Sequence, residues 1–103
     1  MCGRTSLFAA REDVEETFDA RIVADGGYEP RYNIAPGEPL EVITNHARGE
    51  IDRFHWGLLP TWADDTDEGL INARAQTAGE KRSFAEAWES RPCLVLSSGF
   101  YEW

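Results

Sequence analysis

Clusters of glycine and proline divide this chain into segments too short for long helices. Gly26-Gly27 interrupts the first apolar pattern, and Gly57-Leu58-Leu59-Pro60 ends a later one. Residues 30–39 contain prolines at both ends and the run Asn33-Ile34-Ala35-Pro36-Gly37, for which we expect an irregular loop. Only short strands and short helices fit between these breaks.

Two segments have the features of helices. In residues 11–20, apolar side chains recur at intervals of four from Val14 to Phe18 and on to Ile22, with acidic residues in the first turn. Ser83 and Glu86 have the spacing of a capping box, which predicts a second helix from there to about Ser90.

Short apolar runs predict the strands. We expect strands over residues 4–8, 40–44 and 51–56, with a hairpin turn at 45–49, and a short extended piece at 70–74. Residues 93–96 read as a buried strand in which Cys93 is a core residue, and 64–69 as an exposed acidic loop. The pattern predicts one α+β domain over residues 1–103, dominated by strands and with short peripheral helices. Its apolar, aromatic ending suggests the N-terminal part of a longer domain.

The charge balance at first argues against a nucleic-acid partner. Nineteen acidic and ten basic residues give a net charge of −9, which repels phosphates at long range. Nine of the ten basic residues are Arg, and an acid-rich, lysine-poor surface suits a halophilic source as well as an ordinary acidic protein. No apolar run approaches the roughly 20 residues of a membrane span and no signal segment opens the chain, so we expect a cytoplasmic protein.

Cys2 carries the most specific chemistry in the sequence. Removal of Met1 would leave an α-amine and a thiol on adjacent carbons, with reference pKa values of about 8 and about 8.5. Such a 1,2-aminothiol condenses with an aldehyde, first as an imine and then as a five-membered thiazolidine. The alternative is a frayed terminus without a function.

Other clusters are compatible with either chemistry or plain structure. Asn72 and Arg74 alternate with apolar residues, so they would share one face of a strand. Trp62 lies in a loop with Trp56, where exposed rings could stack on unpaired bases or simply pack together. Glu102 stands among aromatic residues, a setting that suits proton transfer or an outward-facing strand glutamate.

Several other classes of site lack their motifs. His46 and His55 show no zinc-binding spacing with the two cysteines, and the sequence contains no phosphate-binding glycine loop and no GxSxG. We therefore expect no metal and no cofactor.

Taken together, five motifs in order resemble the SRAP family, the SOS response-associated peptidases that shield abasic sites in single-stranded DNA. They are Met1-Cys2-Gly3-Arg4, Arg31-Tyr32-Asn33-Ile34-Ala35-Pro36, Trp56-Gly57-Leu58-Leu59-Pro60, Ile71-Asn72-Ala73-Arg74 and Gly99-Phe100-Tyr101-Glu102-Trp103. The resemblance implies a curved, barrel-like mixed sheet with a positively charged DNA groove, acting as a monomer.

The resemblance also implies roles for individual residues. Cys2 would crosslink to the abasic sugar, Asn72 would orient the sugar or the amine, and Glu102 would manage proton transfer. The residues implied at the DNA are Arg4, Asn33, Pro36, Trp62, Arg74, Arg82 and Trp103. The family also supplies a histidine, in a later motif, that this chain lacks.

Two other functions stay open from the sequence. One is an N-terminal-nucleophile peptidase in which the Cys2 thiol attacks a peptide bond. The other is a non-catalytic binding module whose aromatic loop contacts a partner.

Overall fold

The computed structural model describes residues 3–60, 62 and 69–102. Within these ranges, seven short strands and three short helices follow one another. They are β1 (Arg4–Leu7), α1 (Arg11–Phe18), β2 (Arg21–Ile22), β3 (Arg31–Ile34), β4 (Pro39–Thr44), β5 (Glu50–His55), α2 (Ala75–Ala78), α3 (Ala85–Ser90), β6 (Cys93–Val95) and β7 (Gly99–Tyr101).

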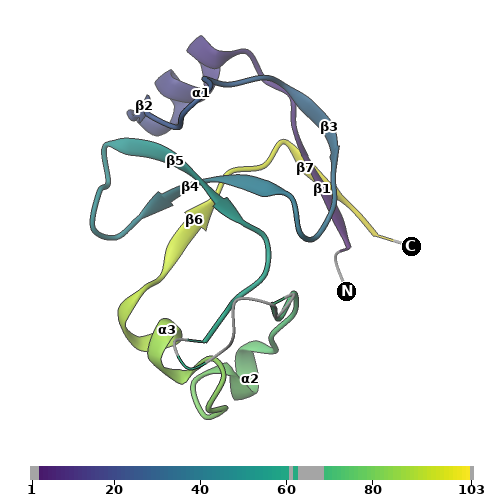
Figure 1. Cartoon of the computed structure of the whole chain (residues 1–103). Helices are drawn as coiled ribbons and strands as arrows, with labels where there is room; N and C mark the ends of the chain where they lie inside the picture. The colour runs from purple at the N-terminus through teal and green to yellow at the C-terminus, as the bar shows by residue number, and fades with distance from the viewer. Residues whose placement is uncertain (1–2, 61, 63–68, 103) are drawn as a thin grey trace.

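The strands form two sheets, shown in Figure 1. A three-stranded antiparallel sheet has the order β3-β1-β7, and a four-stranded sheet has the order β2-β5-β4-β6. The second sheet is mixed, because β2 runs parallel to β5 whereas β4 is antiparallel to β5 and β6. The sheets curve around one core without closing a barrel in the described ranges, which confirms the α+β, strand-dominated prediction.

The core lies between the two sheets and α1. Ile34 and Ile51 are 1% and 0% exposed, and Val14 packs the helix onto the same cluster. β4 is the central strand, because four consecutive residues from Leu40 to Ile43 are buried. A strand buried on both faces fixes its neighbours on either side, so β4 sets the position of the whole scaffold.

The predicted helix at 11–20 and the hairpin of β4 and β5 are confirmed. The irregular loop predicted for residues 30–39 is wrong, because Arg31–Ile34 forms β3 and Pro39 begins β4. Pro30 precedes β3 and Pro39 is the first residue of β4, positions at which a proline is tolerated next to or within a strand. The pairing partner of β3 is β1, far back in the sequence, which local turn signals do not reveal.

The buried strand predicted for residues 93–96 is also wrong in its burial. β6 is at the edge of its sheet, with Leu94 62% exposed and Cys93 exposed, whereas Leu96 beyond the strand end is buried. An apolar strand is buried throughout only where other layers of the fold cover both of its faces, and all three residues of β6 are exposed. Cys93 is therefore not a core residue.

The helix predicted from Ser83 to about Ser90 corresponds to α3 and is shorter than predicted. It begins at Ala85 without a side-chain cap, so the predicted capping box does not form. Glu86 instead accepts a 2.8 Å hydrogen bond from Nε of Arg91 at the other end of the helix. This ion pair lowers the pKa of the Glu86 carboxyl.

Some predictions fall on other parts of the chain. Cys2, Trp103 and residues 64–68 of the predicted acidic loop lie outside the described residues. Across the ranges that are described, no helix is long and apolar enough to cross a membrane.

Candidate nucleic-acid interface

A bulge in β3 determines which side chains face outward from the three-stranded sheet. The register of β3 against β1 shifts by one residue between Ile34 and Arg31. Ile34 is buried and Arg31 contacts the buried Glu41, so both point toward the interior. Tyr32 and Asn33, which lie between them, are both exposed on the opposite side. We call this side the outer face.

The outer face brings two predicted DNA-binding residues together. Nη1 of Arg4 donates a 3.1 Å hydrogen bond to Oδ1 of Asn33 across the β1–β3 pair. Tyr101 lies opposite Arg4 on β7, and its hydroxyl donates a 2.7 Å bond to the carbonyl oxygen of Tyr32 on β3. The Tyr101 side chain therefore crosses β1 and ties the three strands together. A cation and an amide are thereby held beside aromatic rings.

Glu102 lies at the end of this sheet where β1 begins. It directly follows Tyr101, the partner of Arg4, so it is beside Gly3 at the start of β1. Figure 1 shows β1 and β7 side by side in this sheet. Glu102 is exposed, although it stands among aromatic residues in the sequence. Pro36 is in the turn after β3, where Gly37 takes a positive φ of 91°.

A buried carboxylate, that of Glu41, pairs with Arg31 on the inner side of β3, opposite the outer face. Glu41 on β4 is 2% exposed and accepts hydrogen bonds from Arg31 at 2.8 Å and from Arg53 at 3.0 Å. Arg53 also donates to the carbonyl oxygen of Gly27, and Arg31 to that of Pro39. The network joins β3, β4, β5 and the 24–27 turn.

This network changes the role that the sequence suggested for Arg31. Arg31 opens the motif that also contains Asn33 and Pro36, two residues implied at the DNA, and the structure instead pairs it with Glu41 on the inner side of β3. Sequence reasoning missed Glu41 altogether. Its one signal is a carboxylate inside the otherwise apolar run Leu40-Glu41-Val42-Ile43.

Trp62 and Arg82 form a second group of predicted residues. The guanidinium carbon of Arg82 lies 4.6 Å from the centroid of the Trp62 ring, a cation–π contact. Trp62 is 56% exposed, whereas Trp56 packs against the core. Of these two tryptophans, Trp62 is the one whose ring is exposed to solvent.

Asn72 and Arg74 are carried by a third segment. Leu58 and Leu70 exchange two backbone hydrogen bonds of 2.9 Å, which attach the segment to the end of β5. The bridge needs glycine at Gly69, because a Cβ there would lie 3.0 Å from a backbone atom of Gly57. Beyond the bridge the chain is extended but forms no strand as far as it is described. Arg74 then precedes α2 as its N-cap.

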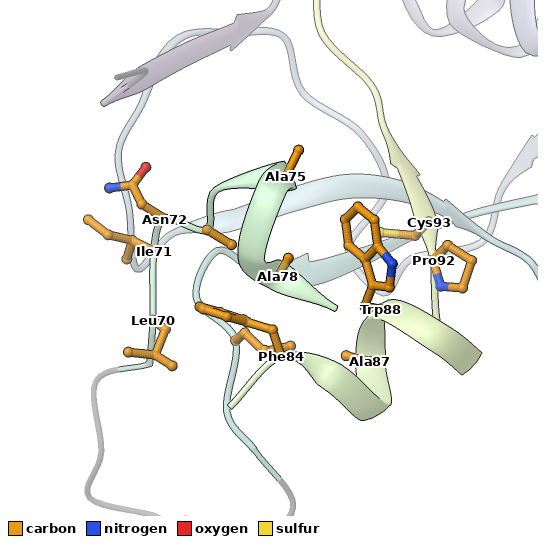
Figure 2. A pocket seen from close by; sticks show the side chains of 12 residues that line it. Leu70, Ile71, Asn72, Ala75, Ala78, Phe84, Ala87, Trp88, Pro92 and Cys93 are labelled. Carbon is orange, nitrogen blue, oxygen red and sulfur yellow. The ribbon is translucent and has the colours of Figure 1, made fainter. Parts of the chain in front are cut away.

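This segment borders an apolar hollow of about 460 Å³, which Figure 2 shows. Trp88 and Cys93 lie on one side of the hollow and Asn72 is at its rim, with its amide directed away from Trp88. Burial against these apolar groups raises the pKa of the Cys93 thiol. The hollow thus offers apolar surface and no activated nucleophile.

The predicted site residues therefore fall into separate groups in the described part of the chain. Arg4 pairs with Asn33, with Glu102 at the same end of the sheet, and Arg82 pairs with Trp62. Asn72 and Arg74 are on the third segment.

Comparisons with known proteins give this arrangement a context. The family model described as SOS response associated peptidase (SRAP) matches residues 1–103. The abasic site processing protein YoqW of Bacillus subtilis is 39% identical over 107 residues, which cover 100% of this chain and 48% of that protein. YedK of Escherichia coli, of the same description, is 33% identical over 108 residues, with coverages of 100% and 48%.

A vertebrate protein gives a similar match. The abasic site processing protein HMCES of Xenopus tropicalis is 29% identical over 130 residues, which cover 100% of this chain and 39% of that protein. The chain thus spans about half the length, or less, of these curated relatives.

Proposed function

The chain belongs to the SOS response-associated peptidase (SRAP) family, and from this we propose that it processes abasic sites in single-stranded DNA by forming a covalent crosslink through Cys2. The observation that carries the proposal is the Arg4–Asn33 pair at the start of β1, two residues after Cys2. A guanidinium there suits a phosphate of the bound strand. The relatives' shared description, abasic site processing protein, supports the same substrate.

The proposed chemistry needs no cofactor. After Met1 is removed, the Cys2 amine attacks the aldehyde carbon of the ring-opened abasic sugar, and loss of one water leaves an imine. The thiol then adds to the imine carbon, its proton passes to the nitrogen, and a thiazolidine ring closes. An imine left open would permit β-elimination and strand cleavage, a lyase outcome that ring closure prevents.

Neighbouring residues would assist this reaction. We assign proton transfer to Glu102, because it lies at the same end of the sheet as Gly3 and carries a carboxyl group exposed to the solvent. Asn72 would orient the sugar or the amine, a role that rests on the family motif at residues 71–74. Arg74, Arg82 and Trp62 would contact the strand on either side of the lesion.

A denaturing gel tests the proposal. A single-stranded oligonucleotide with one abasic site is incubated with the chain and with the Cys2→Ala variant. We expect a slowly migrating band from the unaltered chain only. The Cys2→Ala variant keeps an α-amine after Met1 is removed but lacks the thiol. A band of equal intensity from this variant would therefore exclude the Cys2 thiol from the crosslink, and no band from either protein would exclude the crosslink.

The family description also names a peptidase activity, for which Cys2 offers the thiol. Removal of Met1 happens once per chain, so it is not evidence of turnover. A peptidase would cleave an added peptide many times per molecule, and mass spectrometry of the peptide after incubation distinguishes the two activities.

A further inference from the structure

Two exposed aromatic rings on the outer face, one of them next to Asn33 in sequence, are stacked on each other. The centroids of Phe8 and Tyr32 are 5.2 Å apart and their planes differ by 12°. Phe8 is 47% and Tyr32 66% exposed. Large aromatic side chains contribute most to the stability of a fold when they are buried. A stacked pair left in contact with solvent therefore indicates a surface for a flat apolar ligand.

The backbone holds both rings in place. The amide of Phe8 donates a 3.0 Å hydrogen bond to the Ser98 side chain. The carbonyl oxygen of Tyr32 accepts the 2.7 Å bond from Tyr101 described above. Because the rings are held before any ligand arrives, little conformational entropy is lost on binding.

The stacked pair and Arg4 lie on the same face. The β3 bulge places Tyr32 and Asn33 together on the outer face, and Asn33 accepts a hydrogen bond from Arg4. Phe8 is four residues beyond Arg4 along the chain, a distance of roughly 13 Å at the rise of a strand. About four stacked nucleotides span that distance. One nucleic-acid strand can therefore contact the cation and the rings at once.

We propose that Phe8 and Tyr32 form a stacking platform for an unpaired base of single-stranded DNA, a few nucleotides from the phosphate that contacts Arg4. This inference rests on the proposed function and extends it to the part of the strand that flanks the lesion. Stacking suits this protein, since its net charge of −9 weakens long-range attraction to phosphates. Base–aromatic stacking is independent of sequence and carries little of the salt dependence of ion pairs.

Affinity for unmodified DNA tests the platform separately from the crosslink. Fluorescence anisotropy with a labelled oligothymidylate without an abasic site is measured for the Phe8→Leu/Tyr32→Leu double variant. Phe54→Leu is the control, because Phe54 is 46% exposed but lies on β5 in the other sheet. We expect the double variant to lose affinity about 5- to 150-fold, at low and high salt alike, and the control to lose none.

Equal affinities for the double variant and the control would overturn the platform. If the rings instead pack against another polypeptide segment or a second copy, the double variant would show a changed melting temperature or association state and unchanged DNA affinity. Tyr32→Phe keeps the ring, so we expect it to bind like the unaltered chain even if the double variant folds poorly.

Ultraviolet crosslinking needs no variant. We expect peptide mass spectrometry to find the thymine adduct on Phe8 or Tyr32, and adducts confined to other residues would refute the platform. Abasic-site crosslinking is scored in a separate reaction. If no crosslink to the abasic site forms but Phe8 and Tyr32 still contribute to DNA affinity, the proposed function alone is rejected. If the abasic-site crosslink forms but the two rings do not contribute to DNA affinity, the platform alone is rejected.

Discussion

Nη1 of Arg4 and Oδ1 of Asn33 are 3.1 Å apart, although 29 positions separate these residues in the sequence. The hydrogen bond joins β1 to β3 and orients the guanidinium over the outer face of the sheet. The family resemblance implies both Arg4 and Asn33 at the DNA, and the structure joins the two side chains by this hydrogen bond. This pair connects the fold of the chain to its proposed chemistry.

Arg4 should contribute to DNA affinity in a salt-dependent way. Loss of one phosphate contact reduces the slope of log affinity against log salt concentration by about 0.7 for a single strand. We expect this change for Arg4→Gln, measured by anisotropy with oligothymidylate over a salt series. Arg48→Gln in the β4–β5 hairpin is the control, and an unchanged slope for Arg4→Gln would remove Arg4 from the interface.

Glu41 should be the most destabilising single carboxylate to replace. Glu41→Gln breaks a buried ion-pair network and leaves two guanidinium groups without their shared partner. We expect a loss of about 3–5 kcal/mol in the free energy of unfolding, measured by urea denaturation. The exposed Glu50→Gln on the adjacent β5 should change it by less than about 0.5 kcal/mol, and similar midpoints for both variants would contradict the role of the network.

Elements held together by local hydrogen bonds can be predicted from the sequence, whereas the burial of Glu41 cannot. α1 and the hairpin of β4 and β5 follow from local spacing, because their hydrogen bonds join nearby residues. β3 was predicted as a loop because its partner, β1, is distant in sequence. The burial of Glu41 depends on arginines from two other strands, which no local pattern specifies.

In the candidate site, too, single residues can be predicted from the sequence, whereas the contacts between them cannot. The family resemblance implies Arg4, Asn33, Trp62 and Arg82 one at a time, and the fold then pairs them. The Phe8–Tyr32 stack could not be predicted from the sequence. Phe8 belongs to no motif, and the β3 bulge that turns Tyr32 outward arises from strand pairing.

Tyr28 should make stability sensitive to alkaline pH. Its hydroxyl donates a 2.6 Å bond to the carbonyl oxygen of Ala9, and burial, with the nearby Glu41 charge, raises its pKa above the ordinary 10.0. The unfolded chain then loses this proton first as pH rises, so stability falls from about pH 10 upward.

Tyr28→Phe removes the hydrogen bond and this titration. We expect it to cost about 1 kcal/mol of unfolding free energy near neutral pH and to lessen the decline above pH 10. Thermal melts over a pH series measure both effects. Identical alkaline declines in the two proteins would show that Tyr28 does not titrate as proposed.

Cys93 should react slowly despite the exposure of its residue. Burial raises the pKa of the thiol above 9.0, so less thiolate is present at neutral pH. In a Cys2→Ser background, we expect iodoacetamide to alkylate Cys93 more slowly than a free model thiol, with a rate–pH midpoint shifted upward. Urea should restore the ordinary rate, and a fast reaction in the folded chain would count against the effect of the hollow.

Intact mass spectrometry of the chain with and without abasic-site DNA reports the removal of Met1 and the covalent adduct in one measurement. We expect a protein without Met1 and an adduct equal to protein plus oligonucleotide minus one water. Treatment with borohydride should leave the mass of this adduct unchanged, because a thiazolidine has no imine to reduce. An adduct that gains hydrogen, or that forms equally with Cys2→Ser, would contradict a thiazolidine at Cys2.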